Sequence, residues 1–184
     1  MAIIKTQLPA TSMLKTEDCD FTDSFRGSFA DNNNAIGITE VGKSFFSSSP
    51  KWIDKLFVLR NKIVQLFGLK TAGDISDRQK LLDNFRCEVG EQLGLFKVFG
   101  KKENEVVLGE DDKHLNFRVS LFIDQSLAED EQKQLTISTT VLFKNWFGRF
   151  YFSLIKPFHR LIVPAMLKAI IKDLEHSLTP QSAK

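Results

Sequence analysis

The sequence has little cysteine and almost no net charge. Its two cysteines, Cys19 and Cys87, do not stand in a paired-motif spacing, so they predict free thiols in a reducing compartment rather than a disulfide framework. The 25 Lys and Arg residues nearly balance the 23 Asp and Glu residues, which leaves a net charge of +2. Such a small charge creates no large field to attract nucleic acid or anionic lipid.

Familiar catalytic and targeting motifs are also missing. No G-x-G-x-x-G follows a predicted strand, and the chain has no P-loop, G-x-S-x-G or CxxC pair, so we predict no nucleotide site, cofactor, metal or catalytic residue. The first residues lack a basic leader before an apolar run, which predicts a cytoplasmic protein. The most apolar stretch contains Arg149, Lys156, His159 and Arg160, which excludes a membrane span.

Phenylalanine is the residue in excess, with 17 Phe against one Tyr and two Trp. Because Phe has no polar group, this excess indicates a thick core or a lined apolar cavity, and the core is the more common outcome. The 184 residues, 42% apolar and 26% charged, predict one globular domain over residues 1–184. We expect residues 1–18 to be an irregular lead-in and residues 179–184 to be a disordered tail.

The first half of the chain predicts one strand and several helices. Phe21, Phe25 and Phe29 sit at even spacing and predict a strand. A short helix is expected over residues 40–47 and a weaker one over residues 78–85. Between them, Pro50 and Gly68 bound a predicted helix over residues 50–67. Its apolar stripe consists of Trp52, Leu56, Leu59, Ile63 and Phe67.

From residue 95 onward the period changes to alternation. Residues 95–99 and 105–108 flank the turn GKKEN and predict a hairpin. Residues 114–123 and 135–143 then alternate, with Leu121 and Ile137 on the apolar side and Ser120 and Ser138 on the polar side. The pattern predicts an antiparallel meander with one dry and one wet face.

A long helix over residues 145–177 ends the predicted fold and must cover the dry face. We expect its dry side to hold the following residues: Phe147, Phe150, Tyr151, Leu154, Phe158, Leu161 and Ala165. Arg149, Ser153, Lys156 and Arg160 lie on the other side. Pro157 and Pro164 each remove a backbone donor, so the helix should be kinked or curved and could leave space beneath it.

Three segments of the sequence carry a resemblance to a known family. They are SSSPKWIDKLFVLRNKIVQLFGL, VVLGEDDKHLNFRVSL and STTVLFKNWFGRFYFSLIKPFHRLIVPAML. In that order, over residues 7–174, the chain resembles a bacterial domain-of-unknown-function family of START-like, polyketide-cyclase-like proteins, also found fused to short-chain-dehydrogenase-like domains. The resemblance implies an α+β helix-grip fold, with a curved antiparallel sheet wrapped on a long C-terminal helix, and an apolar cavity. It implies no catalytic residues.

A few polar residues are candidates for a site. Arg60 lies within the apolar stripe of its helix, where it could recognise an anion, form an ion pair or extend to solvent. His114 and Arg118 project from the polar face of a strand, next to Asp111 and Asp112, where a solvated face is more common than a metal or base site. His159 is a boundary residue or part of a site.

These observations leave three functions open. The first is a module that binds a hydrophobic or amphipathic small molecule between sheet and helix. The candidate residues for it are Arg60, Trp52, Tyr151, His159, Phe117 and Phe158. The second is a cyclase-like or hydrolase-like enzyme, which needs Tyr151, His159 and Arg60 to converge on one point. The third, implied only by the resemblance, is an accessory domain for a dehydrogenase-like partner.

Overall fold

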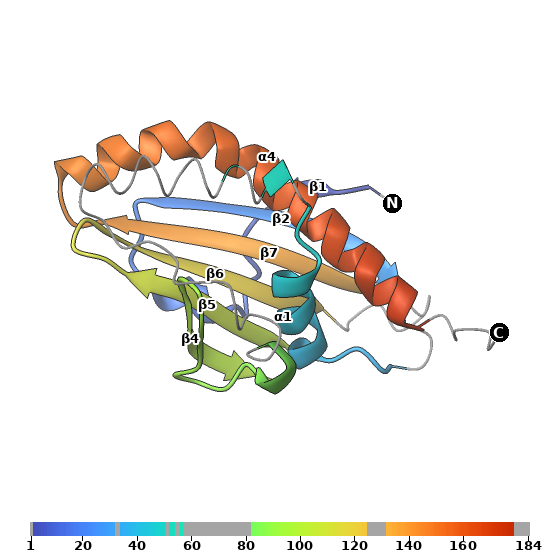
Figure 1. Ribbon diagram of the computed structural model, residues 1–184. Coiled ribbons are helices and arrows are strands. Elements are labelled where there is room, and N and C mark those ends of the chain that lie inside the picture. Colours follow the sequence, from blue (N-terminus) through green and yellow to red (C-terminus); the bar gives the residue numbers. More distant parts are fainter. Residues whose placement is uncertain are drawn as a thin grey trace.

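The chain forms an α+β fold with a seven-stranded antiparallel sheet and a long C-terminal helix (Figure 1). The computed structural model describes residues 2–31, 34–50, 52–53, 56, 82–124 and 132–178. The strands are β1 (Ile4–Thr6), β2 (Phe21–Ala30), β3 (Gln92–Leu93), β4 (Phe96–Lys102), β5 (Glu105–Asp111), β6 (Leu115–Asp124) and β7 (Gln132–Phe143). The helices are the 3-10 turn η1 (Met13–Thr16), α1 (Ile38–Ser47) and α4 (Trp146–Leu178).

The sheet consists of a five-stranded meander, to which the N-terminal strands β1 and β2 are added beside the last strand. Its order is β1-β2-β7-β6-β5-β4-β3, so β3 to β7 follow one another and β2 pairs with the last strand. The hairpin and the two alternating strands predicted from the sequence are confirmed, as is the Phe-rich strand. The helix predicted over residues 50–67, most of the one over residues 78–85 and the tail after residue 178 lie outside the described residues.

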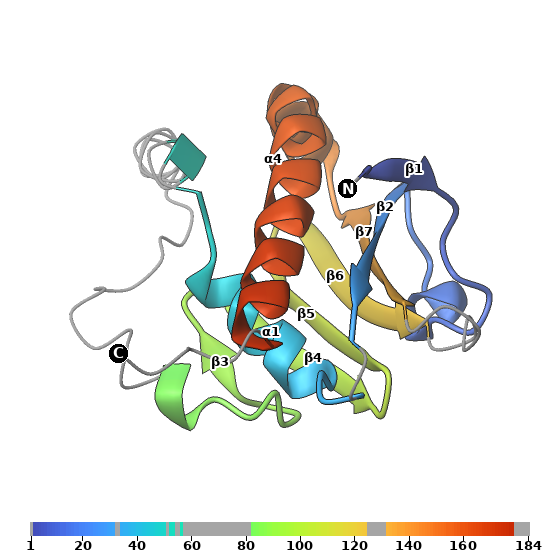
Figure 2. The same cartoon turned by 90° about the vertical axis from the view of Figure 1, so that its right-hand side faces the viewer.

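Helix α4 runs across one face of the sheet as a single curved helix (Figures 1 and 2). Pro157 and Pro164 lie inside it, which confirms that the apolar pattern continues through both prolines. Its second half, together with α1, packs on the sheet through the larger of two apolar clusters, which contains Leu167, Ile170 and Ile171. Among the described residues, no helix is both long and apolar enough to cross a bilayer.

The expected orientation of α4 was wrong. Phe150, Leu154, Phe158 and Leu161, assigned to the dry side, are 51, 54, 47 and 65% exposed. The side that faces the sheet instead carries Gly148, Phe152, Val163 and Met166, with His159 among them. The pattern misled because the first half of α4 is apolar on more than one side, so it does not show which side is buried.

The face of the sheet away from α4 is not wet throughout, contrary to expectation. On β6, Ser120 and Phe122 project away from α4 and yet are 0 and 5% exposed. The N-terminal residues contact this part of the sheet, because η1 packs on β5 and β6. Residues 1–18, expected to be an irregular lead-in, thus contain an edge strand and a 3-10 turn.

A buried carboxylate joins the N-terminal residues to the sheet. Glu105, which is 0% exposed, accepts hydrogen bonds from Ser12 Oγ (2.5 Å), Ser120 Oγ (2.6 Å) and the Met13 amide (2.8 Å). Each donor satisfies part of a charge that would be costly to bury alone. These polar residues therefore form hydrogen bonds with one another instead of with water. Alternation in the sequence cannot distinguish the two cases, so it predicted a solvated face.

Close packing at Gly148 fixes the start of α4 on the sheet. A Cβ atom at this position would collide with the backbone carbonyl of His114, just before β6. Gly148→Ala is therefore expected to lower the free energy of unfolding by about 1–3 kcal/mol, since backbone must move to make room. Urea denaturation measures the change, with Ser153→Ala on the exposed side of α4 as the control. Equal effects of the two substitutions would contradict the packing argument.

Candidate functional site

The apolar interior beneath α4 is divided into two clusters. The smaller cluster is centred on Leu115, Val141 and Phe152, near the start of α4. The larger cluster includes Ile137 and Val163, further along the same strand and helix. Three polar residues lie between the clusters along the chain, namely Asp23 on β2, Thr139 on β7 and His159 on α4, and we call them the polar layer.

The register of the sheet brings two of these residues together. Asp23 and Thr139 are directly opposite each other in the β2–β7 ladder. Side chains that are two residues apart on a strand share a face, so Asp23 projects on the same side as Phe21 and Phe25, toward α4. Thr139 likewise follows Ile137 and precedes Val141. The polar layer thus interrupts an otherwise apolar row on each strand.

Helix α4 supplies the third residue. His159 Nε2 lies 3.0 Å from Asp23 Oδ1, and the two side chains are 15 and 5% exposed. This contact joins the helix to the second strand through a polar bond, at a level where the neighbouring contacts are apolar. Because one imidazole nitrogen is engaged by the carboxylate, the ring is held in one orientation.

The polar layer is incompletely hydrogen-bonded. Asp23 Oδ2 and Thr139 Oγ1 are both buried and have no hydrogen-bond partner among the residues that the structure describes. Leaving such groups unpaired costs roughly 1–3 kcal/mol each, and most buried polar atoms in proteins avoid it. Ser49 Oγ, Asn116 Oδ1 and Arg118 Nε are also unpaired. Only Asp23 and Thr139, however, lie opposite each other in the sheet and beneath α4.

Aromatic rings border the polar layer on the side of the smaller cluster. The Phe21 ring meets His159 edge-on, with centroids 6.1 Å apart, and its centroid is 4.7 Å from that of Phe152. Lys156 places its ammonium 5.0 Å from the Phe21 centroid. The arrangement offers a hydrogen-bonding group at one end and an apolar wall beside it, which is the chemistry that an amphipathic molecule requires.

The predicted site residues are only partly assembled. His159 lies in the polar layer, whereas Tyr151 and Phe117 are half-buried residues packed against the smaller cluster. Trp52 and Phe158 are 44 and 47% exposed, so much of each ring faces solvent. Arg60 lies outside the described residues.

Asp23 and Thr139 were not predicted as site residues. The sequence contains a signal for the first, because Asp23 follows the same two-residue period as Phe21 and Phe25 and is the acidic residue in that row. An acidic side chain in phase with an apolar row needs a partner. Thr139 gives no comparable signal, since threonine is common in strands.

The other histidine candidate has a structural role. The ring of His114 contacts the side chain of Asn145, which in turn accepts a hydrogen bond from the Gly148 amide at the start of α4 (3.0 Å). Arg118 binds Asp111 (2.7 Å) and lies 3.5 Å from the centroid of the Phe99 ring. Among the described residues, no group of three or more His, Cys, Asp or Glu could hold a metal ion.

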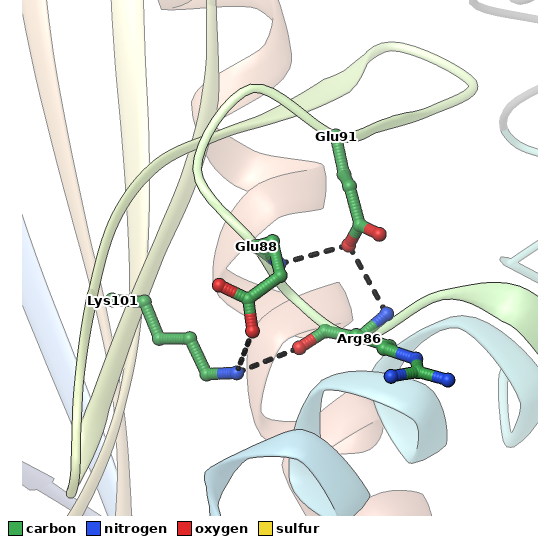
Figure 3. A network of polar contacts seen from close by, with 4 residues as sticks. All are labelled: Arg86, Glu88, Glu91 and Lys101. Atoms are coloured by element: carbon green, nitrogen blue, oxygen red, sulfur yellow. Dashed lines mark hydrogen bonds and ion pairs between the residues drawn. The ribbon is translucent and has the colours of Figure 1, made fainter.

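A surface depression lies at the start of α1, where Gly37 and Glu40 face Glu88 and Lys101. Lys101 donates to the Glu88 carboxylate and to the Arg86 carbonyl, both at 2.8 Å (Figure 3). The Glu91 carboxylate accepts from the amides of Glu88 (2.8 Å) and Arg86 (3.1 Å). Of these four residues only Glu88 and Lys101 line the depression, and because they pair with each other we place the candidate site at the polar layer instead.

Comparison with known proteins identifies a family. Residues 15–166 match the model of a family described as "Protein of unknown function (DUF2867)". The matched range includes Asp23, Thr139 and His159. No curated protein and no solved structure matches the chain.

Proposed function

The chain belongs to the DUF2867 family, whose description states no activity, and we propose from the geometry that it binds an amphipathic small molecule beneath α4. The observation that supports this function is a pair of buried atoms, Asp23 Oδ2 and Thr139 Oγ1, to which no described residue forms a hydrogen bond. A ligand that donates a hydrogen bond to the carboxylate would remove the cost of leaving these groups unpaired. Its apolar part would lie against Phe21 and Phe152.

The charge of the polar layer defines the head group of the ligand. Asp23 contributes a carboxylate whose free oxygen accepts hydrogen bonds, and Thr139 can donate or accept. A hydroxyl or an amine therefore fits this position better than a carboxylate, which Asp23 would repel. This differs from the anionic ligand that an Arg60-centred site would select, and Arg60 lies outside the described residues.

The START-like helix-grip classification remains part of this proposal. The strand order, with a meander closed by β2 and covered by α4, supports that classification. Binding under the C-terminal helix is the general expectation for such folds. A dehydrogenase-like partner and a cytoplasmic location stay predictions.

Thr139→Val provides the sharpest test of the binding proposal. The substitution removes an unpaired hydroxyl without changing the shape of the side chain, so it should raise the stability of the empty protein by about 1 kcal/mol. The same change should weaken the retention of a hydroxyl-bearing ligand about fivefold or more, because a hydrogen bond is lost. Thr140→Val on the opposite face of the same strand is the matched control.

Two measurements separate these effects. Native mass spectrometry of the purified protein detects a retained molecule, and thermal denaturation with decanol, decylamine or decanoate tests the head group. We expect the alcohol and the amine to raise the melting temperature of the wild type more than the acid does. Failure of all three probes to shift the melting temperature, in a protein that retains no molecule, would refute the proposal.

An enzyme is the second candidate, favoured by the Asp23–His159 contact. A carboxylate that orients an imidazole is a common arrangement for a general base. Convergence with Tyr151 is not favoured, because eight helical positions separate it from His159, about 12 Å along the axis. If the retained molecule is a substrate, His159→Gln should bind it and leave it unaltered, whereas the wild type should convert it. Identical molecules recovered from both proteins would count against catalysis.

A further inference from the structure

The first half of α4 exposes a row of large apolar side chains. It comprises Trp146, Phe150, Leu154, Phe158 and Leu161, which are 78, 51, 54, 47 and 65% exposed. Their spacing of three or four residues places them along one side of the helix, and we call this row the apolar stripe. It extends about 22 Å at 1.5 Å per residue. A contiguous row of this kind on a protein surface marks an interaction site more often than a solvated face.

All charged residues in the part of α4 that carries the apolar stripe are basic, and acidic residues appear only in its last two turns, at Asp173 and Glu175. Between Trp146 and Lys172, α4 contains no Asp or Glu, and its charged residues are Arg149, Lys156, Arg160, Lys168 and Lys172. Arg149 and Arg160 are exposed beside the apolar stripe. Lys168 and Lys172 are exposed further along the helix, between the stripe and the C-terminus. The net charge of +2 for the whole chain conceals this local excess.

Nearby acidic groups offset little of this charge. Asp20 approaches Arg149 at 3.7 Å, and the arginine side chain remains 72% exposed. Asp23 is buried and engaged with His159. Arg160 and Lys168 form no ion pair with the residues that the structure describes, so they are available to a negatively charged surface.

We propose that α4 docks through the apolar stripe onto an anionic membrane surface, lying in the plane of the interface. Tryptophan and phenylalanine bordered by Lys and Arg, without acidic residues, are typical of helices that bind in this way. The apolar side chains would enter the boundary between head groups and acyl chains, and the basic residues would contact lipid phosphates. The inference does not depend on ligand binding under α4, since it uses the opposite side of the helix.

Vesicle flotation tests the proposal with the full-length protein. We expect the wild type to float with vesicles of equal parts phosphatidylcholine and phosphatidylserine, to bind pure phosphatidylcholine less, and to be released by high salt. Phe150→Ser/Leu154→Ser should weaken binding about tenfold or more through lost apolar contact. Arg160→Glu/Lys168→Glu should also weaken it about tenfold or more, since the reversed charges are repelled by the anionic lipids that attract Lys and Arg.

Two controls keep the outcome interpretable. Val89→Ser changes another exposed apolar residue, 64% exposed and outside α4, and should leave binding unchanged. In a Trp52→Phe background, Trp146 is the single tryptophan, and its emission should shift to the blue when anionic vesicles are added.

Other outcomes would overturn the proposal. They are no flotation of the wild type, equal flotation of wild type and stripe variants, or equal binding to both lipid mixtures. A wild-type dimer that Phe150→Ser/Leu154→Ser converts to a monomer, measured by light scattering, would assign the apolar stripe to self-association instead. Ligand retention measured without vesicles would be unaffected by any of these results, so the two proposals fail separately.

Discussion

Lys133→Met is expected to lower the free energy of unfolding by about 3–5 kcal/mol at neutral pH, because it leaves a buried carboxylate without its cation. Lys133 Nζ lies 2.6 Å from Asp31 Oδ2, and the two side chains are 9 and 0% exposed. The ammonium also donates to the Ile36 carbonyl at 2.8 Å. The pair joins β7 to the segment between β2 and α1, so its loss should loosen the entry to α1.

The pH dependence of the free energy of unfolding tests whether the ion pair causes this loss of stability. Burial raises the pKa of the Asp31 carboxyl, but the Lys133 bond and the amides of Ile36 and Ala35 outweigh it, so the pKa lies below the usual 3.8. A depressed pKa stabilises the folded protein above about pH 4, and this stabilisation is lost as the pH falls through the folded pKa. The difference between wild type and Lys133→Met should therefore shrink below pH 4.

Urea denaturation at neutral and acidic pH measures both effects. The double variant Lys133→Met/Asp31→Asn should be less destabilised at neutral pH than Lys133→Met alone, because it contains no unpaired buried charge. A loss below about 1 kcal/mol in Lys133→Met, or one independent of pH, would show that the ion pair contributes little.

Glu105→Ala is expected to destabilise the protein by about 3 kcal/mol or more, because three donors lose their acceptor and a cavity forms. Glu105→Gln should have a smaller effect, since its carbonyl oxygen can still accept from the Ser12 and Ser120 hydroxyls. Its amide group would, however, face the Met13 amide, which is also a donor.

Hydrogen exchange locates the effect of Glu105. The amides of residues 13–17 should exchange faster in Glu105→Ala, whereas those of β6 and β7 should follow global stability. Lys102→Ala is a suitable control, because it removes an exposed side chain from the neighbouring strand end. Unchanged exchange at residues 13–17 would show that Glu105 does not hold the N-terminal residues in place.

The sequence predicted the elements of the fold because their periods are strong. The alternation in β6 and β7 and the long apolar pattern of α4 each span enough residues to be unambiguous. The order of the strands in the sheet could not be predicted, because no local sequence pattern indicates that β2 pairs with β7. The side of α4 that is buried also depends on the partner surface and not on the helix sequence alone.

The site could be predicted only in part, because its residues come from segments that are distant in the sequence. His159 was identifiable from the sequence as a polar residue among the apolar residues of the C-terminal helix. Its partner, Asp23, lies 136 residues away on β2. The polar layer exists because register sets Asp23 opposite Thr139, and a one-residue change of register would move both side chains to the other face. Glu105 was missed for the same reason, as its three donors come from distant or opposite segments.

The pairing of β2 with β7 also determines when the chain can fold. Phe21 pairs with Val141, so the centre of the sheet cannot form until most of the chain has left the ribosome. Contacts between residues so distant in sequence slow folding, because loop-closure entropy is lost before the contacts form. Until then β2, with Phe21, Phe25 and Phe29, can pair only with the three-residue strand β1 and lacks its long partner β7, so we expect this segment of the nascent chain to need protection by chaperones.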